Sequence, residues 1–135
     1  MGFQERLERT KTNQDANCWG TAYFLSGASD LDFQKDPGPA IGYWNRLATL
    51  DRPRPLCYAG IVGPMPKGLH FPNIESPNEE YLYHLGIVTS THPIKITHRN
   101  GDKGPIFENE LLTTMVERDI IDQRLRVEFR AFMDS

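Results

Sequence analysis

A run of mostly apolar and β-branched residues, YLYHLGIVTS at 81–90, constrains the fold more than any other part of the chain. A run of this length and composition is typical of a buried central strand. The next such stretch, IKIT at 94–97, follows after a short segment that includes Pro93. We therefore expect the two stretches to pair as a β-hairpin.

Two further strands are predicted. LCYAGIV at 56–62 has the pattern of a half-buried strand, and the segment that follows it, 64–77, contains four prolines and is typical of a long loop. Near the end of the chain, 124–131 alternates strictly between apolar and charged residues. This alternation predicts an antiparallel strand with one solvated face.

Helical patterns occur earlier in the chain. At 18–25 the apolar residues fit one side of a helix, with Asn17 as its N-cap and Gly27 as its end. YWNRLATL at 43–50 predicts a second short helix, and the Pro- and Gly-rich KDPGPAIGYW at 35–44 predicts a loop before it. ENELLTTMVERDI at 108–120 fits a helix and a strand about equally well.

Helices that come early and strands that gather late predict an α+β fold with an antiparallel sheet. The chain has 135 residues, which is enough for one domain with a real core, so we assign 1–135 to a single domain. The charged segment 1–13 is expected to form a short exposed helix or a loose arm of that domain.

Composition narrows the range of functions. The net charge of −3 provides no basic surface for nucleic acid, and no apolar stretch approaches the length of a membrane span. The polar start of the chain lacks the apolar segment of a signal peptide, which predicts a soluble, cytoplasmic protein. Export by a route without a signal peptide, or delivery into another cell's periplasm, remains open.

The stretch DANCWGTAYFL at 15–25 places Cys18 at the predicted start of a helix. Unpaired N–H groups and the helix dipole favour a negative charge there, so we expect a lowered pKa and a reactive thiolate. His84 is the best candidate for the base, because it lies in the central strand next to Gly86, which leaves space beside the backbone. Alternation places Leu82, His84 and Gly86 on one face, where the helix would bring the thiol to the imidazole.

His98 ends the next strand, where a hairpin brings it beside His84. It either orients His84 or is an exposed turn residue. Cys57 is expected to be structural and buried, since free cysteine is among the most buried residue types. The same reasoning applies to Cys18 if it is not a nucleophile, and a Cys18–Cys57 disulfide remains a further alternative.

Zinc is the other chemistry that cysteine and histidine share. No pair among Cys18, Cys57, His84 and His98 has the short spacing of a structural zinc site, so we predict no metal and no cofactor. His70 and His92 lie in loop-like segments and are expected to be solvated.

A cysteine at the start of a helix, a strand that reads HLGIV from His84, and a second histidine after a further strand together resemble the NlpC-type papain-like cysteine amidohydrolases. The motifs cover 15–25 and 83–100. The family usually has Asp before the cysteine and Ser after it, where this chain has Asn17 and Trp19.

The resemblance implies a papain-like α+β domain, with the nucleophile helix packed on an antiparallel sheet. It implies a thiol peptidase or amidase in which Cys18 attacks, His84 transfers protons and His98 orients His84. The family typically cuts amide bonds in peptidoglycan stem peptides of the bacterial cell wall. A cell-wall hydrolase without a signal peptide would have no cell wall to cut in the cytoplasm. One explanation among others is that the protein is an effector toxin delivered into another cell, and a toxin of this kind implies an immunity protein as partner.

The cleft and the oxyanion donors are assigned from the same comparison. The Cys18 backbone amide is the expected oxyanion donor, helped by Gln14 or Asn17, and Trp19 and Tyr83 are candidate substrate-binding residues. Two alternatives stay open: a catalytically silent papain-like binding domain, and a thiol-dependent acyl transferase in which an amine or thiol replaces water.

Overall fold

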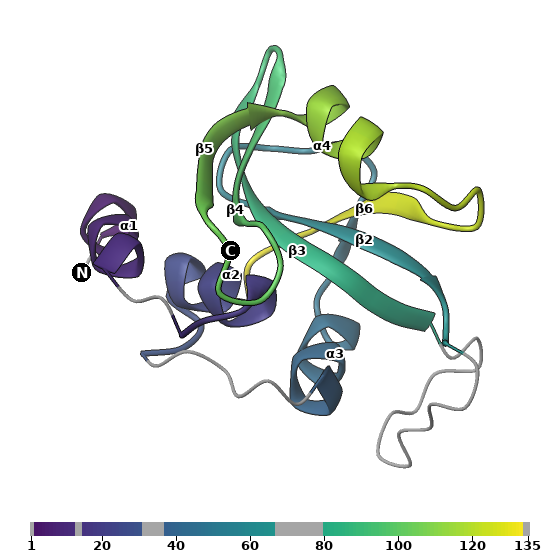
Figure 1. The fold of residues 1–135 in the computed structure, drawn as a ribbon, viewed down its shortest axis with the longest axis horizontal. Coiled ribbons are helices and arrows are strands. Elements are labelled where there is room, and N and C mark those ends of the chain that lie inside the picture. The colour runs from purple at the N-terminus through teal and green to yellow at the C-terminus, as the bar shows by residue number, and fades with distance from the viewer. Residues whose placement is uncertain (1, 13–14, 31–36, 67–79, 134–135) are drawn as a thin grey trace.

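The computed structural model describes residues 2–12, 15–30, 37–66 and 80–133. Its core is a six-stranded antiparallel sheet in the order β1-β6-β2-β3-β4-β5 (Figure 1). The strands are β1 (Thr49–Leu50), β2 (Tyr58–Pro64), β3 (Glu80–Thr91), β4 (Ile94–Arg99), β5 (Ile106–Leu111) and β6 (Arg126–Arg130). The helices are α1 (Phe3–Thr12), α2 (Cys18–Ser26), α3 (Pro37–Asn45) and α4 (Leu112–Asp119). Helices thus accompany an antiparallel sheet, as the α+β prediction required.

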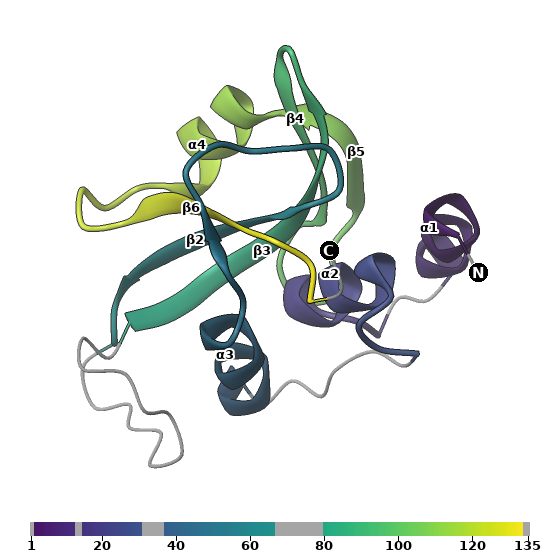
Figure 2. The same ribbon diagram turned by 180° about the vertical axis from the view of Figure 1, so that it is seen from behind.

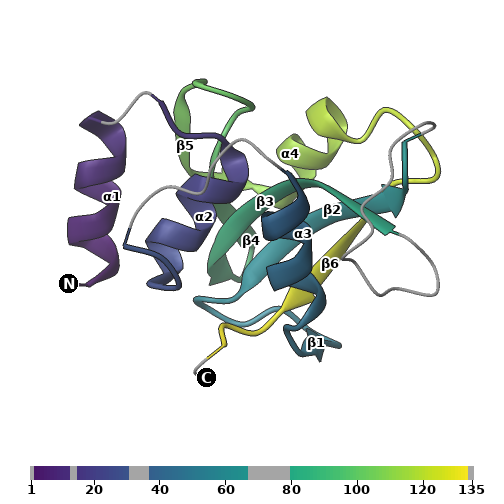
Figure 3. The ribbon, with the colours of Figure 1, turned by 90° about the horizontal axis from the view of Figure 1, so that it is seen from below.

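Helices α1, α2 and α3 lie to one side of the sheet and α4 lies to the other (Figures 1 and 2). On the first side, apolar side chains of α2 and α3 form one core with Leu82, Leu85 and Ile87 of β3. On the second side, Met115 of α4 packs on a smaller cluster from β2, β3 and β4. The view from below shows α2 and α3 lying across the sheet (Figure 3).

The central hairpin is confirmed, because β3 and β4 pair from Ile87 opposite Thr97 to Thr91 opposite Ile94. Strand β3 contains an irregularity, since His84 pairs with Ile61 of β2 while Leu82 pairs with Val62. Tyr83 is the extra residue, and a bulge of this kind lets two successive side chains turn to one face. The strict alternation predicted for this strand is therefore wrong at Leu82, which lies on the side of Leu85.

Two other local predictions were wrong or incomplete. Helix α3 begins at Pro37, within the segment expected to be a loop, and the helix expected at 43–50 ends at Asn45 before strand β1. Proline is compatible with the first turn of a helix, where its missing N–H has no helical partner. The ambiguous segment 108–120 contains the end of strand β5 followed by α4.

The N-terminal segment forms α1 rather than a loose arm. Its Arg6 reaches α2, where its guanidinium donates hydrogen bonds to the carbonyl oxygens of Phe24 at 2.9 Å and Ser29 at 3.0 Å. Strand β2 is buried over Tyr58–Gly63 on both faces rather than half-buried. Of the predicted loop at 64–77, residues 67–77 lie outside the described residues, and His70 is among them.

Candidate active site

Cys18 is the first residue of α2, as predicted, and the N-cap geometry explains why the helix begins there. The Asn17 side-chain oxygen accepts a hydrogen bond from the Gly20 N–H at 2.8 Å, and the Asn17 carbonyl accepts one from Thr21. Gly27 ends the helix in the left-handed region, where glycine is favoured. The backbone N–H groups of Cys18 and Trp19, at the start of the helix, act to lower the pKa of the Cys18 thiol.

The Cys18 side chain is buried, with 6% of its surface exposed. Burial raises the pKa of its thiol to about 11, although hydrogen bonds from the backbone N–H groups of Leu85, Trp19 and Cys18 itself partly offset this. The expected lowering of the pKa by the helix N-terminus is therefore overturned, because the loss of hydration outweighs the helix N–H groups. At neutral pH the resting state is the thiol.

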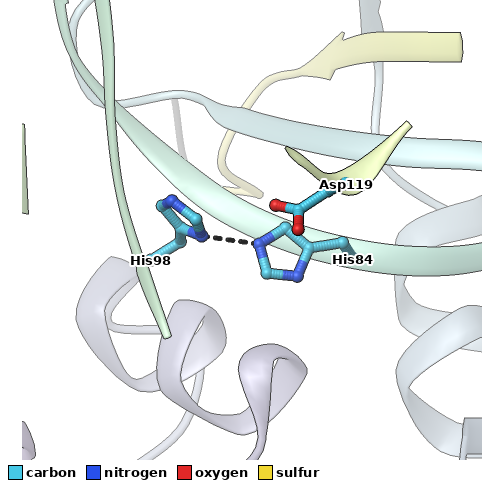
Figure 4. A group of neighbouring side chains, drawn as sticks. All are labelled: His84, His98 and Asp119. Carbon is cyan, nitrogen blue, oxygen red and sulfur yellow. Dashed lines mark hydrogen bonds between the residues drawn. The ribbon is translucent and has the colours of Figure 1, made fainter. Parts of the chain in front are cut away.

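His84 and His98 are brought together, as the hairpin prediction required (Figure 4). Their ring nitrogens, Nε2 of His84 and Nδ1 of His98, are 2.7 Å apart, and the rings are nearly perpendicular. His98 is buried with 1% exposed, so the alternative of an exposed turn residue is wrong. Its other ring nitrogen, Nε2, lies 2.8 Å from the Glu110 carboxylate of β5.

This chain of hydrogen bonds determines which ring nitrogens carry protons. A carboxylate can only accept a hydrogen bond, so Nε2 of His98 carries a proton and donates it to Glu110. In a neutral ring Nδ1 of His98 is then an acceptor, which requires His84 to donate from its own Nε2. Nδ1 of His84 is left with a lone pair. His84 is thereby prepared to accept a proton at Nδ1.

The carboxylate that starts this chain is itself held by Arg118 of α4. The Arg118 guanidinium donates to both oxygens of Glu110, at 2.7 and 2.8 Å, and to Asp119. These hydrogen bonds are the main cause that lowers the pKa of Glu110 to about 2. Burial lowers the pKa of both His84 and His98. At pH 7 the group therefore holds an ionised Glu110 and two neutral rings.

Cys18 meets β3 in a different way from the one predicted. Helix α2 packs on Leu82, Leu85 and Ile87, whereas His84 shares the opposite face with its cross-strand partner Ile61. The Cys18 sulfur instead reaches the strand backbone, where the N–H of Leu85, the neighbour of His84, donates to it. Among the hydrogen bonds of the described residues, none joins the thiol to the His84 ring.

Space beside Gly86 is also used differently from the prediction. A Cβ atom at Gly86 would lie 2.6 Å from Ile96 and 2.9 Å from the His98 Cβ. Glycine therefore allows β4 to approach β3 closely, and this approach places His98 against His84. The space beside Gly86 is occupied by Ile96 and His98 of β4 and is not left for a substrate.

A buried arginine connects the strand that carries His98 with the helix that carries Cys18. Arg99, next to His98 on β4, donates to the Thr21 hydroxyl of α2 at 2.8 Å and to the Thr10 carbonyl of α1 at 3.0 Å. A third hydrogen bond reaches the Gly104 carbonyl at 2.9 Å. Because Thr21 is one turn after Cys18, Arg99 fixes the strand of His98 relative to the cysteine helix.

The predicted substrate-binding residues have other contacts in this state. The Trp19 indole donates to the Leu82 carbonyl at 3.0 Å and packs edge-on against Tyr81. The Tyr83 hydroxyl donates to the Pro64 carbonyl at 2.6 Å, on the face opposite α2. Asn17 is the helix cap, and Gln14 lies outside the described residues.

Sequence reasoning missed Glu110 and Arg118, and it missed Asp119 as well. Its side chain is only 19% exposed and lies beside the two histidines (Figure 4). No local signal marks these residues, since they are brought to the site by β5 and α4. Cys57 is buried and His92 is exposed, as expected, and Cys18 and Cys57 are free rather than disulfide-bonded.

Comparisons with protein-family models, with curated proteins and with solved structures find no match to this chain. Among the described helices, none is long and apolar enough to cross a membrane.

Proposed function

We propose that this protein is a papain-like cysteine hydrolase that cleaves amide bonds, with Cys18 as nucleophile and His84 as general base. The observation that carries the proposal is the chain from Glu110 through His98 to His84, because it leaves a lone pair on Nδ1 of His84. A nucleophile, a base and a third group that orients the base are the parts that such catalysis needs.

The reaction would begin from neutral partners. The thiol and the His84 ring are not hydrogen-bonded in this structure, so the first step requires the two to come together. Nδ1 of His84 would then take the thiol proton as the sulfur forms a bond to the substrate carbonyl carbon. The developing oxyanion would accept hydrogen bonds from the N–H groups of Cys18 and Trp19. The positive charge gained by His84 would be stabilised through His98 by Glu110.

The leaving amine would then take this proton from His84 as the amide bond breaks, which leaves a thioester on Cys18. Water, deprotonated by the same nitrogen, would attack the thioester and release the acid and the thiol. Peptide amides of peptidoglycan stem peptides are the substrate class implied by the NlpC-type motifs at 15–25 and 83–100. If the protein is a delivered toxin, its partner would be an immunity protein.

Three observations favour a second candidate, a catalytically silent domain of the same fold. The thiol is buried, its pKa is raised to about 11, and Trp19 is hydrogen-bonded across the helix start. A binding domain would keep these contacts without turnover. An acyl transferase would use the same thioester, with an amine in place of water.

Turnover of defined stem peptides, followed by mass spectrometry of the products, tests the proposal. We expect hydrolysis by the native protein and its loss in Cys18→Ala and in His84→Ala, with Cys57→Ala and His92→Ala as matched controls. A thioester trapped on Cys18 would support the mechanism directly. Amide products formed with added amines would identify a transferase. Folded protein with no turnover and no thioester across these peptides would favour the silent domain.

Alkylation of Cys18 by iodoacetamide, mapped by peptide mass, tests the resting state. Because the reactive species is the thiolate and its pKa is about 11, we expect slow alkylation at neutral pH that rises steadily into the alkaline range. Rapid alkylation below pH 7 that disappears in His84→Ala would contradict a neutral pair and indicate a preformed thiolate–imidazolium pair.

A further inference from the structure

Three potential metal ligands converge at the base histidine. One ring nitrogen of His84, one ring nitrogen of His98 and a carboxylate oxygen of Asp119 all lie within 4.8 Å of one another (Figure 4). The facing nitrogens, Nε2 of His84 and Nδ1 of His98, are 2.7 Å apart and share one proton. In a tetrahedral zinc site with Zn–N bonds of about 2.0–2.1 Å, ligand atoms lie roughly 3.3 Å apart, so the rings would separate by less than about 1 Å.

The surroundings of these ligands fit a bound cation. A histidine ligand commonly donates its second ring N–H to a carboxylate, which fixes the tautomer and makes the ring a better ligand. His98 already makes this contact through Nε2 to Glu110, at 2.8 Å. With both rings neutral, the charges of the group are those of Glu110, Asp119 and Arg118, a net −1 that favours a cation.

We propose that His84, His98 and Asp119 form a site for one zinc ion, and that zinc binding there switches the hydrolase off. The ion would replace the proton shared by the two rings, with water in the fourth position. Nitrogen and carboxylate donors suit zinc, and three protein ligands with one open position are common for this metal. The cysteines are not ligands of this site, which differs from the Cys–His set that the sequence excluded.

Inhibition would follow from the position of one proton. In the resting protein His84 carries its proton on Nε2 and accepts on Nδ1. An ion on Nε2 requires the proton of the neutral ring to move to Nδ1, through solvent, with no proton released from either ring. Nδ1 then has no lone pair for the thiol proton. This second step rests on the proposed function, whereas the binding of zinc does not.

Binding is measured first, without substrate, by competition between the protein and a chromogenic zinc chelator. We expect one equivalent of zinc bound by the native protein and bound equally by Cys18→Ala. In Asp119→Asn and His98→Ala we expect affinity to fall at least ~10-fold, the lower limit for loss of a supporting contact in a metal site. Glu117→Gln, an exposed carboxylate of the same helix, is the matched control.

The binding proposal is overturned if the native protein binds no zinc, if folded Asp119→Asn binds it as tightly, or if Cys18→Ala loses it. Circular dichroism and thermal unfolding of each variant separate a lost ligand from a lost fold. Because chelator competition needs no turnover, zinc binding can be established even if no peptide substrate is cleaved, in which case only the hydrolase proposal fails.

Inhibition is measured second, by comparing each variant with its own zinc-free rate. We expect zinc to stop hydrolysis by the native protein and, at the same concentration, to inhibit Asp119→Asn at least ~10-fold less, in proportion to its weaker binding. Equal inhibition of the two would overturn the proposed route and indicate direct capture of the Cys18 thiolate. Zinc-dependent hydrolysis by Cys18→Ala would overturn both roles and identify a metallohydrolase.

Discussion

The two faces of the sheet use the same strands for different purposes. The face covered by α2 and α3 is a continuous apolar core that includes Tyr23, Ile41 and Leu85. The face beneath α4 has a smaller apolar cluster around Met115, beside which lie His84, His98 and Glu110. Apolar burial holds the first face together, and a fully connected set of hydrogen bonds positions the second. The difference shows how one sheet can keep a rigid core and still bury a proton-accepting histidine.

The largest expected effect comes from weakening the apolar face. Leu85→Ala would remove a fully buried side chain between β3 and α2, and we expect the free energy of unfolding to fall by about 2–5 kcal/mol. Chemical denaturation measures this loss. A loss below about 1 kcal/mol would show that the α2 face is not the main core.

A smaller effect is expected from separating β3 and β4. Gly86→Ala would place a Cβ against Ile96 and His98, and overpacking of this kind typically costs about 1–3 kcal/mol. Gly42→Ala in helix α3 is the matched control, since a Cβ there meets nothing within 4 Å and alanine favours a helix.

We expect Gly86→Ala to unfold at lower denaturant and to lose the short hydrogen bond between the two rings, whereas Gly42→Ala would be neutral or more stable. Imidazole nitrogen chemical shifts report the hydrogen bond. If Gly86→Ala were as stable as Gly42→Ala, the close approach of the two strands would not be what positions His98.

The polar face is tested more selectively by Glu110→Gln. We expect a stability loss of about 1.5 kcal/mol, because hydrogen bonds to charged groups contribute in this range. The amide of the glutamine can present either its oxygen or its NH2 group to His98. We therefore expect the two histidine rings to populate more than one tautomer in Glu110→Gln, where the native protein has one. Nitrogen NMR of the imidazoles measures this, with Glu117→Gln as control. Unchanged ring protonation would show that Glu110 does not determine the tautomer of His84.

The smallest effect on stability is expected at the ion pair between Glu80 of β3 and Arg126 of β6. The Arg126 guanidinium donates to both carboxylate oxygens of Glu80, and the distance from Nη2 to Oε1 is 2.8 Å. The hydrogen bond from Arg126 lowers the pKa of Glu80 in the folded state. Its contribution is therefore present above the unfolded pKa and is lost as pH falls through the folded pKa.

Because both side chains are partly exposed, we expect Glu80→Gln to lower stability by no more than ~1 kcal/mol at pH 7. The difference from the native protein should shrink as the pH falls through the lowered pKa of folded Glu80, and it should disappear once that carboxyl is protonated. A difference that persisted in acid would mean that packing, and not charge, explains the effect of the substitution.

The predictable parts of this protein are those with local causes. The start of α2 at Cys18 follows from the Asn17 cap, and the hairpin that brings His98 to His84 follows from two apolar runs with a short segment between them. Helix α3 begins in a segment whose prolines and glycines predict a loop, because the pattern does not show that proline there occupies the first turn of a helix.

The sequence by itself determined the α+β architecture, the cysteine at a helix start and the pair of histidines, because caps, periodicity and strand pairing act between residues near in the chain. Only the tertiary structure decided the pKa of Cys18, the face on which His84 lies, and the contacts of Glu110, Arg118 and Asp119. Burial, a strand bulge and the packing of α4 against the sheet depend on residues far apart in sequence. No short pattern in the chain records them.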